Sequence, residues 1–581
     1  MKKTIKKRGQ KIVRRVSRFS KKASQEGKEH LKENFFGRIS HIRDIKLLIA
    51  EWSLLVIAVI LLAITQAIWF NNSYSTETFA DGGTYTEGTI GKINSMNPLF
   101  ASNESEKVLS RLMFETLTTI DTTGHVAPGL AKSITPTNNG KTWLIELREN
   151  LKWSDGEPIT NADVIFTTSL IKNSAVTTIY DANLTGVKVS ETEDGKIQFD
   201  LPTIYADFAS ALNFPIVPEH ILKDVDPKNL LESQFSASPI VSGPFAFNAV
   251  QKSSKADEQV IYLNTNKNYY KHEPLLNSFA VHTFLTKEAL VNALNSGTIS
   301  ATASLSPADA ELITSSDINE KQTAINSGVF AFFNINSEIL KNKDFRIGIK
   351  QAINLDIIRG IAKDQPVLDY PLLESQIKLK NYPELTAYNQ DEASKKFDPV
   401  IDAAGEAGIT LNLATVNSGY LPIVAEEFAN ELREYGINVN ISVYEENQEF
   451  ISNIISKRNY DILIYEIELG AEPDIFTYYH SSQAGTSGHN LSNYKNFLID
   501  DLILGARETI NADLRASKYE SFIYYWTADV PAIALYQTNL SYFHNKNVRA
   551  FSDENILTTP LDRFRDVEFW SSHKSTKNRT P

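Results

Sequence analysis

The chain of 581 residues contains no cysteine. Disulfide bonds, thiolate metal sites and cysteine nucleophiles are therefore excluded. The sequence also lacks a GxxxxGKS/T phosphate loop, a GxSxG elbow and an HExxH helix, and its ten histidines are scattered. These absences argue against an enzyme, and we expect no cofactor and no resident metal. A hydrolase whose serine, histidine and aspartate meet only in space stays an alternative.

Acidic residues are scarce at the N-terminus, whereas basic residues are outnumbered in the rest of the chain. Residues 1–46 hold 16 Lys or Arg against 4 Asp or Glu, a net charge of +12. The remaining residues carry 42 basic and 66 acidic side chains, a net charge of −24. A basic arm can bind nucleic acid or anionic lipid. An apolar segment follows this arm directly, so its position favours lipid, and no nucleic acid partner is expected.

Charged residues are missing altogether between Trp52 and Trp69, the single long apolar run. A helix over this run covers about 25 Å, most of a hydrocarbon core of about 30 Å. We expect a transmembrane signal-anchor helix over residues 47–70, which holds the protein in the cell membrane as a single-pass chain. The Lys/Arg excess predicts that residues 1–46 are cytoplasmic and that everything after the helix is extracellular or periplasmic. A buried core helix and a signal peptide cleaved near residues 78–80 are the alternatives.

About 500 residues follow the helix, too many for one hydrophobic core, so two or more lobes are expected. Residues 72–83 are rich in Ser, Thr, Gly and Asn, which is typical of a flexible segment, and we expect a tether over residues 71–81. Residues 571–581 lack apolar side chains, which predicts a disordered tail.

The segment from Thr142 to Ile171 predicts a strand, a turn and a capped helix in quick succession. Apolar and polar residues alternate at its start, and residues 154–158 read Ser-Asp-Gly-Glu-Pro, a turn sequence. Thr160 followed by Asp163 fits a capping box, in which each side chain satisfies a free N–H group at the start of a helix.

A second stretch predicts an α/β fold. Residues 409–416 and 437–443 alternate as strands, and 460–465 supply a third strand. Apolar residues recur at helical spacing over 424–435 and 450–455, between these strands. This β-α-β-α-β order predicts a parallel or mixed sheet covered by helices, with a ligand beyond the carboxyl ends of the strands.

Several short motifs recur in an order that resembles one protein family, the extracellular solute-binding proteins family 5 of peptide and nickel ABC importers. The resemblance covers almost all of the chain after the apolar run. Its motifs are Asn97-Pro98-Leu99, Phe114–Leu117, Gly124, Pro128–Ala131, Thr142–Ile171, Ser242–Phe245, Asn266–Tyr270, Phe332-Phe333-Asn334, Asp344-Phe345-Arg346, Gln351–Asn354, Tyr460-Asp461, Glu472-Pro473-Asp474, His480-Ser481 and Asn490.

The resemblance implies a two-lobed, periplasmic-binding-protein-like fold of type II, the large peptide-binding class. Lobe I would comprise residues 82–327 plus 538–570, and lobe II residues 328–537, with a hinge where the chain crosses. Most bacterial relatives are tethered through a lipidated cysteine. This chain has none, so the apolar helix is the natural substitute.

By the same resemblance the protein binds a short peptide in the cleft between the lobes and delivers it to ABC permease subunits. Those subunits are powered by cytoplasmic ATPases. Another solute, such as an oligosaccharide or a nickel chelate, and a sensory role are the alternatives.

The candidate ligand-binding residues follow the last predicted strand. In peptide-binding relatives an aspartate just before an Asp-Pro-Asp-like motif holds the peptide ammonium group, and an ungapped match puts Leu469 there. Glu466 or Glu468 is expected to replace it, with Asp474 as a third candidate. A solvated loop carboxylate is the alternative for each glutamate. The usual Gly-Trp pair of the family is absent, and Tyr465 begins the replacing stretch.

Further candidates come from the matched motifs. The resemblance places Phe332, Asn334, His480 and Asn490 along the cleft, and it gives Arg346 a structural role. His480 and His489 are nine residues apart, which fits no common zinc pattern. A metal-chelate site is the alternative to two polar loop residues, and no metal ligand is assigned.

Overall fold

The computed structural model describes residues 46–180, 184–252, 258–552 and 555–578. The basic arm predicted for residues 1–46 lies outside these ranges, except for Lys46. Contacts divide the chain into two compact units. Of the described residues, 46–78 and 575–578 belong to one unit, and those within 79–574 belong to the other.

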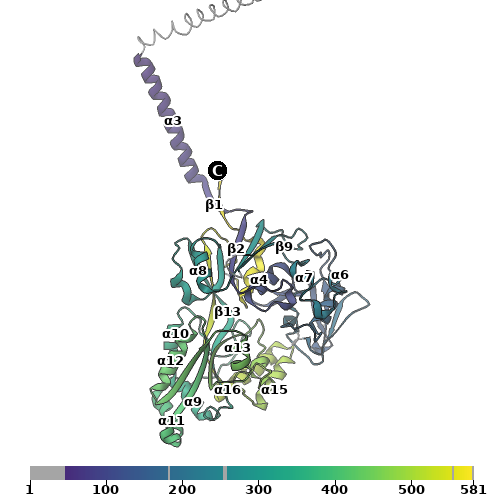
Figure 1. Cartoon of the computed structure of the whole chain (residues 1–581), viewed down its shortest axis with the longest axis vertical. Helices are drawn as coiled ribbons and strands as arrows, with labels where there is room; N and C mark the ends of the chain where they lie inside the picture. The colour runs from purple at the N-terminus through teal and green to yellow at the C-terminus, as the bar shows by residue number, and fades with distance from the viewer. Residues whose placement is uncertain (1–45, 181–183, 253–257, 553–554, 579–581) are drawn as a thin grey trace, which may run out of the picture. The chain divides into compact units, whose positions relative to one another are not determined.

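The first unit contains the apolar helix α3 (Lys46–Tyr74), which bears the label α3 in Figure 1. Within it, Ala50–Trp69 has a mean hydropathy of 2.2, and its residues are exposed. By length and composition this helix can cross a membrane.

Strands replace the predicted tether and part of the predicted tail. The helix continues to Tyr74, β1 (Ser75–Phe79) follows it, and β1 pairs with β18 (Lys574–Asn578) in a two-stranded sheet. Ser- and Thr-rich composition is typical of a flexible segment. Here each strand supplies the main-chain partners that the other needs, which composition alone does not reveal.

A ten-stranded mixed sheet runs through the second unit. Its spatial order is β15 (Ile437–Tyr444), β14 (Ile409–Val416), β16 (Ile462–Glu468), β13 (Ile318–Phe333), β17 (Ala532–Asn545), β12 (Ala301–Leu305), β2 (Thr84–Ile90), β11 (Ser278–Phe284), β10 (Gln259–Thr265) and β9 (Phe245–Lys252).

The two central strands, β13 and β17, are long and antiparallel, and their register shifts twice near the middle, between Ala324 and Gly328 and between Val329 and Phe330. The first of these shifts is the break in the pairing. Residues 318–324 pair with 539–545, and the register shifts before pairing resumes at Gly328 with Gln537. Figure 1 shows β13 between the elements around β2 and those around α12. The break therefore divides one sheet into two halves.

The hydrophobic core divides at the same place. One cluster of buried residues runs from Val329 to Tyr536, and a second takes residues from 85–325 and 540–570. A small third cluster surrounds α8 (Lys287–Asn295). The lobe boundaries predicted at 327 and 537 stay a proposal, and the buried residues of the two main clusters lie on either side of them.

Helices cover the half of the sheet that carries β14, β15 and β16. The β-α-β-α-β order predicted from the sequence is confirmed: α12 (Leu421–Arg433) connects β14 to β15, which are parallel. The short α13 (Gln448–Phe450) and a π-helical turn at Ile451–Ile455 connect β15 to β16. The other helices here are α9 (Lys343–Ala352), α10 (Leu355–Ile361), α11 (Gln390–Ala404), α14 (Phe476–Tyr479), α15 (Phe497–Arg507) and α16 (Ala512–Asp529).

The opposite half carries a small additional sheet and the capped helix. Its strand order is β5 (Ala131–Thr137), β6 (Thr142–Leu147), β8 (Ile197–Asp200), β7 (Lys188–Glu191). The predicted capping box is present at α5 (Asn161–Ile171), where the main-chain N–H of Thr160 donates to Asp163 at 2.8 Å. This half also contains α4 (Glu104–Met113), the hairpin of β3 (Thr118–Ile120) and β4 (Val126–Pro128), and the short helices α6 (Glu219–Leu222) and α7 (Gln234–Ala237).

A buried ion pair joins the first and last parts of the second unit. Arg563 donates to Glu87 on β2 through Nε at 3.1 Å and Nη2 at 2.5 Å, and both side chains are fully buried. The hydroxyl of Tyr85 donates to the other oxygen of Glu87 at 3.0 Å and also contacts the hydroxyl of Tyr542. Two charges without solvent contact thus depend on each other.

We expect Arg563→Met to destabilise the protein by about 3–5 kcal/mol, because it leaves the Glu87 carboxylate buried without a cation. Chemical denaturation of the purified full-length chain measures this loss. Lys395→Met is the control, since the Lys395–Glu392 pair is exposed and its loss should have little effect on stability. Equal losses in both variants would show that burial of the Arg563 pair contributes nothing.

Candidate functional site

The loop after β16, residues 469–475, is hydrogen-bonded to β13 at the break in the β13–β17 pairing. The main-chain N–H of Leu469 donates to the carbonyl of Asn326 at 2.7 Å, and the Asn326 side chain donates to the carbonyl of Gly470 at 2.8 Å. Gln376 Nε2 donates to the carbonyls of Leu469, Gly470 and Glu472 at 2.7, 3.1 and 3.1 Å. Five hydrogen bonds therefore fix the position of this loop.

Glu466 and Glu468 both lie within β16, which extends beyond the predicted strand. Glu466 is half-buried and accepts a hydrogen bond of 2.8 Å from Thr538 Oγ1 beside the break. Burial raises the pKa of the Glu466 carboxyl, and the negative charges of Glu468 and Glu446 add to the rise, against the hydrogen bond from Thr538. Alternation along the strand puts Glu468, which is exposed, on the same face.

Aromatic hydroxyl groups surround this strand end. Tyr465 donates to Glu446, and Tyr478 donates to the carbonyl of Glu468 at 2.9 Å. Burial and the Glu468 charge raise the pKa of Tyr478, so this hydroxyl stays protonated and acts as a donor. The result is an acidic edge on which hydrogen-bond donors already hold several oxygens.

Asp474 already has two partners from different parts of the chain. The hydroxyl of Tyr205 donates to Asp474 Oδ2 at 2.8 Å, and Arg507 Nε lies 3.2 Å from the same oxygen. Its other oxygen accepts the N–H of Phe476 at 3.2 Å. In this arrangement the Asp474 carboxylate is neutralised within the protein.

Phe332, Asn334 and Asn490 are buried in the half of the second unit that carries β14, β15 and β16. Phe332 is a core residue, 1% exposed. Asn334 donates to main-chain carbonyls at 3.0 and 3.2 Å, and Asn490 donates to the carbonyl of Tyr494 at 2.8 Å and accepts its N–H at 3.1 Å. The side chains of these three residues are used here for packing and for hydrogen bonds with the main chain. Their contact with a ligand stays a prediction.

His480 stacks on Phe476 with the ring centroids 4.3 Å apart, and its Nδ1 lies 2.8 Å from Ser482 Oγ. Burial lowers the pKa of His480, so the ring is neutral near pH 7. His489 is exposed. Among the residues that the structure describes, no group of three His, Cys, Asp or Glu side chains is placed to hold a metal.

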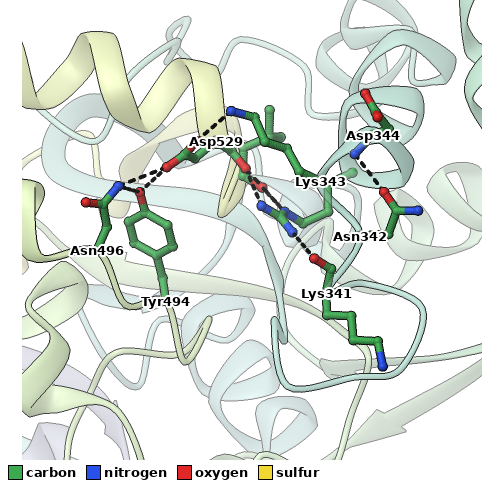
Figure 2. Close-up of polar contacts among 9 residues, drawn as sticks. Lys341, Asn342, Lys343, Asp344, Tyr494, Asn496 and Asp529 are labelled. Carbon is green, nitrogen blue, oxygen red and sulfur yellow. Dashed lines mark hydrogen bonds and ion pairs between the residues drawn. The ribbon is translucent and has the colours of Figure 1, made fainter.

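Arg346 makes its contacts with main-chain carbonyls. It donates to the carbonyls of Asp529, Val530 and Leu340 at 2.6, 3.0 and 2.8 Å. Figure 2 shows the neighbouring Asp529 side chain, which accepts from Lys343 at 2.8 Å, Tyr494 at 2.6 Å and Asn496 at 3.1 Å. Arg346 is thus a structural residue that joins α9 to the end of α16.

A cavity of about 380 Å³ opens beside the break in the central strands. It is lined by Val367, Leu368, Asp369, Tyr370, Leu372, Leu373, Glu374, Ser375, Tyr382 and Gln537. Sequence reasoning missed this segment, and it also missed Tyr205, Gln376, Arg507 and Thr538. No local pattern marks these residues, because their partners are distant in the chain.

Comparison with known proteins decides the family. Residues 125–488 match the family described as "Bacterial extracellular solute-binding proteins, family 5 Middle". The chain belongs to this family. It is 24% identical over 492 residues to the oligopeptide-binding protein AppA of Bacillus subtilis. The aligned residues cover 79% of this chain and 87% of AppA.

Solved structures of family members share the fold. AppA from B. subtilis in complex with a nonapeptide superposes with a TM-score of 0.70 at 22% identity, over 85% of this chain and 99% of AppA. The substrate-binding protein CtaP from Listeria monocytogenes gives 0.73 at 24% identity, over 84% and 99%. NikZ from Campylobacter jejuni in complex with Ni(L-His) gives 0.69 at 20% identity, over 84% and 99%. This family 5 member therefore has the two-lobed α/β fold of a solute-binding protein.

We expect the stability of this family 5 protein to depend on pH through Glu472. Burial raises the pKa of Glu472 to about 7, Asp207 adds to the rise, and Arg515 opposes it. In the unfolded chain a glutamate has a pKa of about 4.3. The stability present below that value is therefore lost as the pH rises to about 7, since only the unfolded state releases its proton in this window.

Glu472→Gln removes this dependence. It should raise the free energy of unfolding by about 1–3 kcal/mol at pH 8 and leave it unchanged at pH 4, as measured by urea denaturation. The exposed Glu406→Gln serves as the control at both pH values. A gain of the same size at pH 4 and pH 8 would rule out titration as its cause.

Proposed function

We propose that the chain is the membrane-anchored, substrate-binding component of an ABC importer, and that it captures short peptides between its two lobes. The observation that carries this proposal is the similarity to an oligopeptide-binding protein along 79% of the chain. The protein would pass its peptide to permease subunits, and ATPases on the cytoplasmic side would supply the energy. It would do no bond chemistry itself.

The chemistry of a peptide suits a cleft of this kind. A peptide has main-chain donors and acceptors along its length and a positive charge at its amino end, so strand-like hydrogen bonds and one ion pair can hold many sequences. The half-buried Glu466 supports this reading, because a desolvated carboxylate gains most from an added cation.

Glu466 and Glu468 are the residues we assign to the ammonium group. At the position of the aspartate used by peptide-binding relatives, Leu469 is buried and its main-chain N–H and C=O are both hydrogen-bonded. Asp474 is paired with Arg507 and Tyr205, which favours the two glutamates over it. Tyr465 precedes Glu466 on the same strand. Phe332 and Asn334 lie toward the other end of β16, beside Leu463 and Asp461, and their contact with the ligand stays a prediction, as does that of His480 and Asn490.

The amine assignment is tested with one peptide in two forms, with a free amino group and with an acetylated one. Mass spectrometry of molecules that co-purify with the protein provides the peptide. Glu466→Gln or Glu468→Gln should weaken binding of the free-amine form by about 2–5 kcal/mol, roughly 30-fold to several-thousand-fold, and leave the acetylated form little changed. Isothermal titration calorimetry measures both affinities.

Glu449→Gln is the matched control, because Glu449 is exposed in the same lobe. Its effect should stay below about 1 kcal/mol. Equal, small effects on both forms would place the amine elsewhere. A co-purifying chelate or sugar in place of a peptide would favour the other solute classes of the family.

The helix α3 would anchor the protein with its N-terminus in the cytoplasm. Support comes from the net charge of +12 over residues 1–46 and from the apolar stretch Ala50–Trp69 that follows. Positive charge is retained on the cytoplasmic side of a spanning helix. The second unit would then face the outside, where the family's ligands arrive.

Protease added to intact cells should remove the second unit and spare the N-terminal arm. Antibodies to an epitope tag at each end of the chain report the two fragments on a blot. Cells opened with detergent provide the control, in which both ends are digested. A mature protein in the medium that begins near Asp81 would show that the helix is a cleaved signal peptide.

A further inference from the structure

A short segment that follows the small four-stranded sheet of lobe I reaches across to lobe II. Residues 205–207 follow β8 and precede the 3₁₀ helix Phe208–Leu212. Phe208 is fully buried and packs on Trp143 and Phe199, with ring centroids 5.9 and 5.6 Å apart. The segment is therefore held firmly by the core cluster of lobe I.

Its three residues all contact α15, α16 or the loop that follows β16 in lobe II. Asp207 forms an ion pair with Arg515, and these side chains are only 5% and 17% exposed. The main-chain N–H of Ala206 donates to the carbonyl of Arg507 at 2.8 Å. Tyr205 donates to Asp474 at 2.8 Å.

Arg507 is the centre of this contact. Its guanidinium group lies 4.2 Å from the ring centroid of Tyr205 and 4.7 Å from that of Phe476, so it is enclosed between one ring from each lobe. Its Nε lies 3.2 Å from Asp474 Oδ2. A cation between two aromatic faces with a carboxylate at its edge is a specific arrangement.

We propose that Tyr205, Asp207, Asp474, Arg507 and Arg515 form a latch that holds the two lobes together without cargo. The lobes are joined by the chain only at the break in β13 and β17, so a separate contact between them biases the hinge. Asp474 is then a positioning residue for closure and not a ligand contact. The consequence for peptide affinity rests on the proposed function, whereas the latch itself is a property of the chain alone.

Charge burial makes the latch sensitive to substitution. When the lobes part, Asp207 and Arg515 both gain water, so the loss of one partner is costly only in the latched form. Asp207 Oδ2 is buried and has no hydrogen-bond partner among the described residues, which limits the strength of the contact. A latch of moderate strength is one that can open.

The absence of cysteine allows a direct test on the full-length chain in detergent. Glu193→Cys in lobe I and Glu406→Cys in lobe II, both exposed, receive spin labels, and pulsed electron resonance measures the distance between them without peptide. We expect a single narrow distance in the otherwise unchanged chain. Asp207→Asn and Arg515→Met should each shift at least half of the molecules to a second distance.

Two further variants make the test decisive. Asp513→Asn lies on the same helix as Arg515, but its side chain is 84% exposed and pairs within lobe II, so it should leave the distances unchanged. Tyr205→Phe keeps the ring over Arg507 and removes only the hydroxyl, which gives a milder variant if the charge changes impair folding. One distance that persists in all the folded latch variants would overturn the proposal.

Peptide binding separates the latch from the proposed function. If only a fraction of molecules is latched, the apparent affinity falls by that fraction, whatever the ligand. Arg515→Met should therefore weaken free-amine and acetylated peptides by the same factor, at least twofold, unlike the Glu466 variant. A distance shift without any peptide binding would keep the latch and reject the peptide, and peptide binding with no shift would do the reverse.

Discussion

The pairing of β13 with β17 is the constraint on which the rest of the second unit depends. The two strands lie side by side in the sheet. β16, β14 and β15 follow on the β13 side, and β12, β2, β11, β10 and β9 follow on the β17 side. The pairing is lost for residues 325–327, where the register shifts. The strand order of the sheet is continuous, but its main-chain pairing is interrupted at this place. The hydrophobic core divides at the same place.

The candidate site is built from the groups that this break leaves without a strand partner. Asn326 turns its carbonyl and its side chain to the loop after β16, and Thr538 on the other strand holds Glu466. A change in the angle between the lobes would therefore directly change these hydrogen bonds at the acidic end of β16. This is a physical reason for a ligand site to lie beside a hinge.

The sequence was enough to predict the parts of the fold that local patterns dictate. Residues 409–416 alternate and form β14, and Thr160 with Asp163 caps α5 as expected. The family fold followed from motifs spread along the chain. By contrast, the pairing of β1 with β18 joins residues that composition marks as flexible, and the sequence carries no local signal of a partner so far away.

The residues proposed for the candidate site could be named from the sequence, but their contacts could not. The acidic stretch from Glu466 to Asp474 is visible in the sequence, but the partners of Asp474 are not. Tyr205 meets it only because the lobes approach each other, Arg507 comes from α15 of the same lobe, and neither belongs to a motif. The hydrogen bond that Glu466 accepts likewise comes from Thr538, a residue from another strand.

The two-stranded sheet of β1 and β18 has a consequence for the order of events during synthesis. Thr78 and Ser575, whose side chain and carbonyl lie 3.5 Å apart, are separated by 497 residues. β1 leaves the ribosome nearly 500 residues before its partner does. Contacts of such long sequence separation form late. The sheet can therefore exist only on a chain that has been made to its end, and a product truncated before Lys574 lacks it.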